Sequence, residues 1–88
     1  MYLNIGASVV IPQDDILGIF DLDNTTWSRH TRNFLAQAEK LGRVTSAGDD
    51  LPKSFLLCKD RGGRVTVYLS QLSPATLIRR LEGGETAF

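Results

Sequence analysis

Cysteine, histidine and tryptophan each occur only once in this chain of 88 residues, and their scarcity excludes several kinds of protein. One cysteine, Cys58, cannot form an internal disulfide, and the ligand spacing of a structural zinc site is missing. A chain of this size buries only about 60–65% of the surface that its unfolded form exposes. Since neither disulfides nor a metal can compensate, we expect one small domain that is stabilised by self-association.

Long apolar runs are also missing, as is an excess of charge of either sign. No run approaches the roughly 18 apolar residues of a membrane-spanning helix, and no basic-then-apolar leader opens the chain. With a single cysteine, these features predict a cytoplasmic protein without a membrane partner. Ten basic and ten acidic side chains cancel, which disfavours a protein coated in positive charge. A local basic patch for DNA stays compatible with this balance, above all if an assembly repeats it.

The most regular pattern in the chain is one amphipathic stripe. Its members lie at helical spacing and are Trp27, Thr31, Phe34, Leu35, Ala38 and Leu41. They predict the main helix over about 27–41. Asn24, Thr25 or Thr26 is placed to cap its start, and Gly42 to end it in a left-handed turn.

The remaining apolar and β-branched segments predict short strands. These are residues 2–5, 9–11, 16–20, 44–46, 54–59 and 64–70. The sequence DRGG at 60–63 suits a hairpin loop between the last two strands. Ser73 and Pro74 open a short helix over about 74–82, and residues 83–88 read as a flexible tail. Together they predict one α+β domain over residues 1–82.

The segment IFDLDNTTW, residues 19–27, resembles the first motif of the haloacid dehalogenase phosphatases. In that motif Asp21 would be the nucleophile and Asp23 a general acid/base. Phosphoryl transfer also needs a cation on the transferring group, and the family spreads its motifs over a doubly wound sheet. One main helix and about 65 residues after Asp23 leave too little chain for the crossovers. We therefore interpret Asp23-Asn24-Thr25 as a capped turn between strand and helix.

Other chemical signals are equally weak. His30 is flanked by Ser28 and Arg29 on the side of the helix away from the stripe, which is typical of a solvated histidine. Cys58 lies in an apolar strand, where an inert thiol is expected. The glycine pair at 62–63 lies between strands rather than before a helix, so it is not a phosphate loop. The sequence predicts a non-enzyme with no cofactor and no metal.

Two groups of basic side chains stand out on the predicted helices. They are Arg29, His30 and Arg32 at the start of the main helix, and Arg79 and Arg80 at the end of the last one. Cations at a helix start oppose the macrodipole. Either Asp21 and Asp23 offset them, or they form a patch for phosphate or for an acidic partner. At a helix end cations suit the dipole, so the second pair is interpreted as stabilising.

Several segments together resemble the RemA/RemB family of bacterial extracellular-matrix (biofilm) regulators, and the RemB branch most closely. They are MYLNIG, VVIPQDDILGIFDL, FLAQAEKLG, LPKSFLLC and VYLSQLSPATLIRR, and they span Met1 to about Arg80. The resemblance implies a small α+β protomer that closes into a homo-oligomeric ring. It also implies a transcriptional regulator that displays basic residues from each protomer to DNA. A ring would bury apolar faces and strand edges between neighbours.

The chain departs from the DNA-binding RemA branch at two places. That branch is basic just before the third strand and in the loop before the Pro-Lys-Ser-like segment. Here the residues are Asp15 at the first place and Asp49-Asp50 at the second, and only Lys53 keeps a basic character nearby. A carboxylate repels phosphate, so we expect the family's own contact to be lost at both places.

Two hypotheses follow. In the first, the chain is a ring-forming, DNA-binding regulator whose repeated phosphate contacts gain from avidity. Its candidate residues are Lys53, which the resemblance implies, and Arg43, Arg29 and Arg32, which local charge suggests. In the second, it is an interaction or scaffold protein of the same fold, whose acidic loop meets a basic protein partner.

Overall fold

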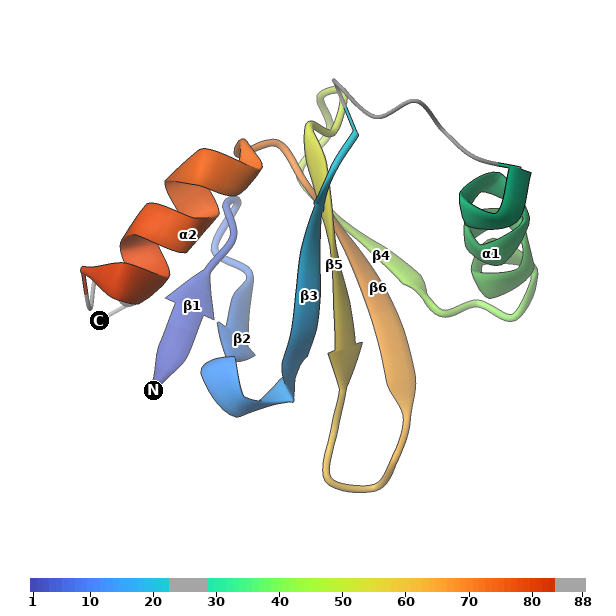
Figure 1. Cartoon of the computed structure of the whole chain (residues 1–88), viewed down its shortest axis with the longest axis horizontal. Helices are drawn as coiled ribbons and strands as arrows, with labels where there is room; N and C mark the ends of the chain where they lie inside the picture. Colours follow the sequence, from blue (N-terminus) through green and yellow to red (C-terminus); the bar gives the residue numbers. More distant parts are fainter. Residues whose placement is uncertain (23–28, 84–88) are drawn as a thin grey trace.

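A mixed four-stranded sheet forms the centre of the molecule, in the order β3–β5–β6–β4 (Figure 1). Its strands are β3 (Ile16–Asp21), β4 (Val44–Ala47), β5 (Ser54–Lys59) and β6 (Val65–Ser70). β5 pairs antiparallel with β3 and β6, whereas β4 pairs parallel with β6. The computed structural model describes residues 1–22 and 29–83.

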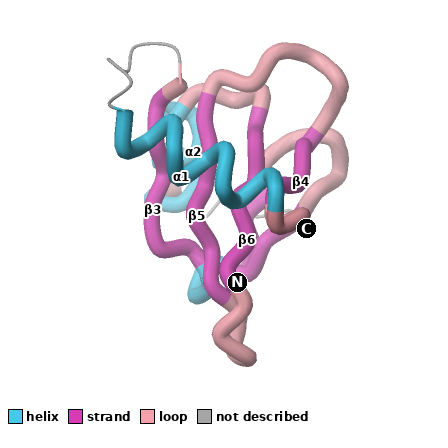
Figure 2. Tube along the Cα trace, turned by 90° about the vertical axis from the view of Figure 1, so that its right-hand side faces the viewer, coloured by secondary structure: helices cyan, strands magenta, loops and turns pink. Residues whose placement is uncertain are grey.

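A hairpin and two helices cover the sheet. The hairpin consists of β1 (Tyr2–Asn4) and β2 (Val10–Pro12), and a 3-10 turn (Gln13–Asp15) leads from it into β3. The hairpin and α2 (Pro74–Glu82) lie on one side of the sheet, and α1 (Arg29–Lys40) lies on the other (Figures 1 and 2). The described residues therefore form a small α+β domain with two helices, as the sequence predicts.

Alternation along β5 explains why both faces of the sheet are covered. Leu56 and Cys58 point into the larger core, together with Leu3 and Leu77 from the hairpin and α2. Phe55 points to the other face, where the smaller core lies under α1. Successive side chains of a strand alternate between faces, so an apolar residue at nearly every position of β5 supplies both cores.

The predicted strands and the last helix agree closely with the structure. α2 begins and ends at the predicted residues, and the Ser73 side chain accepts a hydrogen bond from Thr76 N at 3.2 Å. β1 stops at Asn4 because Gly6, at φ 108°, starts a turn. In that turn Asn4 Oδ1 accepts from Gly6 N at 2.7 Å.

The main helix differs from its prediction in burial. Described residues place its start at Arg29 and its end at Lys40, with Gly42 at φ 69°. Trp27 and the candidate caps Asn24, Thr25 and Thr26 lie outside the described residues. Of the stripe residues that the structure describes, only Ala38 is buried, while Phe34 is 42% and Leu41 57% exposed. The helix therefore covers its face of the sheet incompletely.

Buried hydroxyl groups join the two ends of the chain to the sheet. Ser70 Oγ donates to Ile5 O at 2.7 Å, and Ser54 Oγ donates to Leu72 O at 2.8 Å. Arg80 Nη1 donates to Asn4 O at 2.9 Å, which places α2 against β1. Both serines are fully buried, so each hydroxyl satisfies a polar group that would otherwise be costly to bury.

Neither helix of the described residues combines the length and the apolar character that a membrane span requires.

Candidate functional site

Lys53 lies at a well-defined position at the start of β5. Its backbone N donates to Ser70 O at 2.8 Å, and its carbonyl accepts from Leu22 N at 2.9 Å. The side chain is exposed. The fold therefore presents one cation beside the C-terminal ends of β3 and β6.

The other three candidates divide between the two ends of α1. Arg29 and Arg32 are exposed in its first turn. Arg32 lines a cavity of about 350 Å³ together with Pro52, the residue before Lys53. Arg43 follows the far end of the helix, where its carbonyl accepts from Val67 N at 2.8 Å. The structure thus brings Arg32 and Pro52, the residue before Lys53, to one cavity. It places Arg43 on a different cavity.

Asp15 and the pair Asp49-Asp50, the acidic residues singled out in the sequence, lie at opposite ends of the central sheet. Asp15 directly precedes β3 and lines a small cavity of about 60 Å³ with Asp60 and Arg64. Asp49 and Asp50 follow β4, whose last residue, Ala47, pairs with Ser70 at the other end of β6. One protomer therefore does not bring these two places together, because the length of the sheet separates them.

A basic hairpin tip is the clearest feature that sequence reasoning missed. Lys59, Arg61 and Arg64 are all exposed in the β5–β6 turn. Asp60 shapes the turn, because its Oδ1 accepts from Arg64 N at 2.9 Å and its carbonyl accepts from Gly63 N at 3.0 Å. The segment KDRGGR, residues 59–64, could have indicated this basic tip, since three of its six residues are basic. Asp15 lies beside this tip, so the local charge is mixed.

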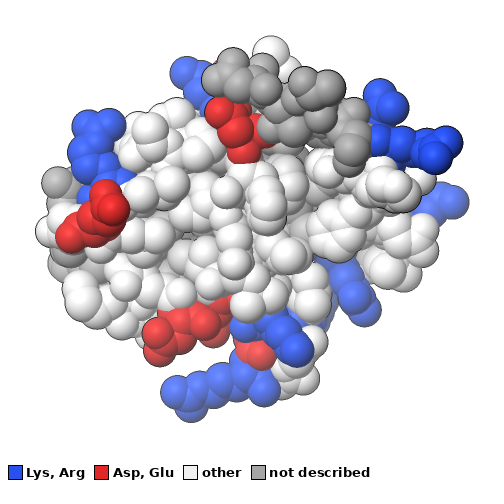
Figure 3. Space-filling model, viewed as in Figure 1, with Lys and Arg blue, Asp and Glu red and all other residues white. Residues whose placement is uncertain are grey.

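On the face shown in Figure 3, charge lies around the margin rather than in one stripe. Figure 3 shows basic and acidic side chains in separate groups around the edge of one face, with an uncharged centre. This face of the described residues therefore carries no extended basic surface for a phosphate backbone. Multiple copies would be needed to place these groups along a DNA duplex.

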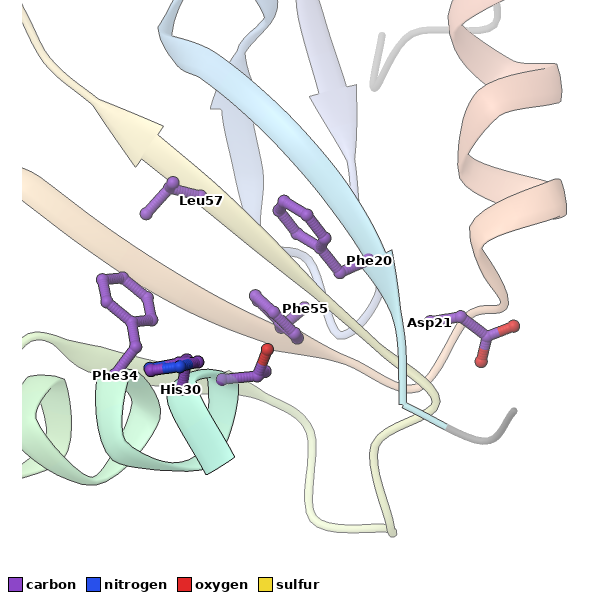
Figure 4. A pocket seen from close by; sticks show the side chains of 7 residues that line it. Phe20, Asp21, His30, Phe34, Phe55 and Leu57 are labelled. Carbon is purple, nitrogen blue, oxygen red and sulfur yellow. The ribbon is translucent and has the colours of Figure 1, made fainter. Parts of the chain in front are cut away.

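An apolar opening lies between α1 and the sheet. This aromatic cleft has a volume of about 350 Å³ and is lined by Phe20, Asp21, His30, Thr31, Phe34, Phe55 and Leu57. Phe20 stacks on Phe55 with ring centroids 4.7 Å apart. His30 and Phe34 project from α1 beside these sheet residues (Figure 4). His30 is exposed, as predicted, but it also borders an apolar cleft.

A second opening lies at the far end of α1. We call it the Arg43 cleft; it has a volume of about 210 Å³ and is lined by Phe34, Gln37, Ala38, Leu41, Arg43, Val65 and Val67. Together with the cavity at Arg32, these openings surround a helix that buries only Ala38. Incomplete packing of this kind is typical of a surface that a partner covers.

The structure places the catalytic candidates of the sequence as follows. Burial, and secondarily the charge of Asp15, raises the pKa of Cys58 from its ordinary 9.0 to about 11, so the reactive thiolate is disfavoured. The described part of the chain groups no set of three metal-ligating side chains. Asp21 ends β3 and borders the aromatic cleft, while Asp23, its partner in the phosphatase-like motif, lies outside the described residues.

Comparison with models of known protein families finds no match for this chain, and comparison with curated proteins finds none either.

Proposed function

We propose that the chain is a homo-oligomeric transcriptional regulator of the RemA/RemB extracellular-matrix type, which contacts DNA through basic side chains repeated around the assembly. It acts without catalysis, cofactor or metal. The whole-chain resemblance motivates this proposal. The structural observation that supports it best is the open α1 face, because a protomer with three apolar cavities around one helix gains stability from self-association.

The resembling segments also belong to one structural unit. MYLNIG, the Pro-Lys-Ser segment and the YLSQLSP segment meet through the bonds from Ser70 to Ile5 and from Ser54 to Leu72. Each serine comes from a segment that carries the resemblance. The similarity therefore concerns a set of residues that depend on one another for the fold.

We assign the DNA contact to Lys53, Arg29 and Arg32, with Arg43 as a further candidate at the far end of α1. Exposed cations gain little individually, but repetition around an assembly multiplies the phosphate contacts. The carboxylates at Asp15, Asp49 and Asp50 make each protomer a weak binder. DNA binding is therefore expected to require the assembled form.

Anisotropy of labelled duplex DNA tests this function at about 50 and 200 mM salt. We expect binding that weakens steeply with salt, and a smaller salt slope for Lys53→Glu. Arg79→Glu is the matched control, because Arg79 is exposed on α2, away from the assigned contacts. Absence of binding at the lower salt, with an assembled protein, would remove the DNA contact from the proposal.

The acidic, apolar loop after β4 favours a second candidate function, a scaffold that regulates through a protein partner. Asp49 and Asp50 are exposed, and Leu51 is 88% exposed. A loop of this composition suits a basic protein surface better than DNA. Affinity capture from a native lysate tests it, and recovery of no protein partner, with or without DNA, would exclude this role.

A further inference from the structure

The loop after β4 presents an apolar side chain between acidic neighbours and the start of the next strand. Leu51 is 88% exposed, the largest exposure among the large apolar side chains of the described residues. Asp49 and Asp50, which directly precede it, are exposed as well. We call residues 49–51 the Leu51 loop. An apolar side chain held in water beside two carboxylates is suited to a socket that is apolar inside and basic at its rim.

The structure holds this loop in place. With its side-chain amide oriented so that the oxygen faces the loop, Gln71 accepts from Asp49 N at 2.9 Å and from Asp50 N at 2.7 Å. Gly48, at φ 108°, brings the backbone so close that a Cβ would overlap the Gln71 amide. A loop that is fixed before binding loses less conformational entropy when a partner covers it.

The Arg43 cleft has the complementary chemistry. Its floor is apolar, with Ala38 and Val67 buried, and Phe34 and Leu41 are partly exposed at its rim. Arg43 and the neighbouring Lys40 are exposed cations. A closed apolar cavity of roughly 150 Å³ accepts benzene, so a cleft of about 210 Å³ has room for a leucine side chain.

Charge distinguishes this cleft from the other two openings around α1. Among the described residues that line them, Asp21 borders the aromatic cleft and Glu39 borders the cavity at Arg32. The lining of the Arg43 cleft includes a cation and no carboxylate among the described residues. Carboxylates of the Leu51 loop would therefore meet a carboxylate at the first two openings, beside Arg32 in the second, and only a cation at the third.

The loop and the cleft of one chain lie too far apart to meet. Arg43 directly precedes β4 and the Leu51 loop follows it. The four residues of β4, which are extended over about 13 Å, separate the two features. Only a second copy can bring the loop to the cleft.

We propose that the Leu51 loop of one copy inserts into the Arg43 cleft of the next, with Asp49 and Asp50 facing Arg43 and Lys40. The contact joins two different surfaces, so it is head-to-tail, and repetition closes a ring when the rotation between copies permits. It rests on the self-association in the proposed function and identifies the surfaces that carry it. Burial of one leucine and pairing of these charges then link every neighbouring pair.

Two variants separate the halves of the contact. The loop variant combines Leu51→Ser with Asp49→Lys and Asp50→Lys, and the cleft variant combines Arg43→Glu with Lys40→Glu. We expect each to weaken association by about 10- to 100-fold, the loss that corresponds to one buried leucine. Light scattering after size exclusion should then report the 9.7 kDa protomer for each variant alone. Circular dichroism checks that both stay folded, since all five side chains are exposed.

Mixing the two variants gives the sharpest result. A loop variant still has an intact cleft, and a cleft variant still has an intact loop, so one good contact forms between them. The mixture should yield chiefly a dimer of twice 9.7 kDa. Larger species should grow only at higher concentration, because the second contact pairs the new lysines with the new glutamates but lacks Leu51. Uniting all five substitutions in one chain reverses both partners' charges but lacks Leu51, so it should restore association only partly. Leu17→Ser and Arg79→Glu, at an exposed leucine and an exposed arginine elsewhere, are the matched controls and should keep the wild-type mass.

The outcomes distinguish this contact from the proposed function. A wild-type protein that is monomeric at high concentration overturns both. An assembled wild type whose loop and cleft variants keep the same mass overturns this contact and leaves the self-association standing. Monomeric variants that form no dimer on mixing overturn the head-to-tail arrangement.

Discussion

The two faces of the central sheet are packed to different degrees. On the face covered by the β1–β2 hairpin and α2, the core consists of seven buried residues, and Leu3, Ile5, Leu56 and Leu77 are fully inaccessible. On the face covered by α1, three of the described residues are buried, and Phe20 and Phe34 are more than 40% exposed. The first face supplies most of the stability of the isolated chain. The second face is where the molecule has apolar surface left for a partner.

The two faces also differ in the hydrogen bonds that link segments distant in the chain. The Ser70 and Ser54 hydroxyls, the Asn4 carbonyl and the Arg80 guanidinium all act between the sheet, β1 and the segment before and within α2. They make the well-packed side rigid. On the other face, the turn that follows α1 joins the sheet, because Arg43 N donates to Ala38 O at 2.9 Å and Arg43 O accepts from Val67 N at 2.8 Å.

Truncating one leucine on each face gives the largest expected difference. Leu77→Ala removes a fully buried side chain from the larger core, and we expect a loss of about 2–5 kcal/mol in the free energy of unfolding. Leu35→Ala, on the half-buried side of α1, should cost about 1 kcal/mol because less apolar area is removed. Urea unfolding of both variants measures the two losses in the free energy of unfolding. Equal losses would contradict the difference between the faces.

Removing the hydroxyl of Ser70 tests the hydrogen bonds that this side chain makes on the well-packed face. Ser70→Ala leaves Ile5 O without this donor in a buried setting, and Leu72 N without this acceptor in a partly buried one. We expect a loss of about 1–3 kcal/mol in the free energy of unfolding, because a buried partner is left unpaired. Thermal unfolding monitored by circular dichroism provides the measurement. Ser46→Ala, at an exposed position of β4, is the control and should change little.

The thiol of Cys58 provides the smallest and most local test of the larger core. Its pKa is raised by burial, and by the charge of Asp15, from 9.0 to about 11. A raised folded-state pKa means that this stabilising contribution is complete below pH 9 and is lost as the pH rises toward 11. In native protein, reaction with a thiol reagent should stay slow until that range and become fast after unfolding. Rapid labelling of the folded protein near pH 8 would contradict a closed core.

Local sequence patterns were sufficient to predict many elements of the fold. β5 alternates apolar side chains between two faces, and Ser73-Pro74 caps and starts α2 where the sequence places it. The turn at Gly42 likewise follows from its need for a positive φ. These elements depend on residues close together in the chain, so periodicity and capping chemistry predict them. The sequence also indicates that Lys53 is exposed, but it does not indicate which residues lie near Lys53 in space.

Burial and neighbourhood were decided by the tertiary structure. The stripe from Thr31 to Leu41 correctly indicates which side of α1 faces the sheet, yet sequence spacing cannot tell how closely a helix approaches. The mixed charge of the basic hairpin tip depends on Asp15, which lies far away in sequence but beside Asp60 and Arg64 in space.

The sequence by itself determined the class of domain, the bounds of the strands and of the last helix to within one residue, and the balance of charge, because these follow from short-range rules. Only the tertiary structure decided that Asp15 and Asp49-Asp50 lie at opposite ends of the sheet. It also decided that Leu51 lies exposed at one end of β4 and the Arg43 cleft opens at the other. Strand order and pairing set these separations, and they arise from contacts between residues distant in the chain.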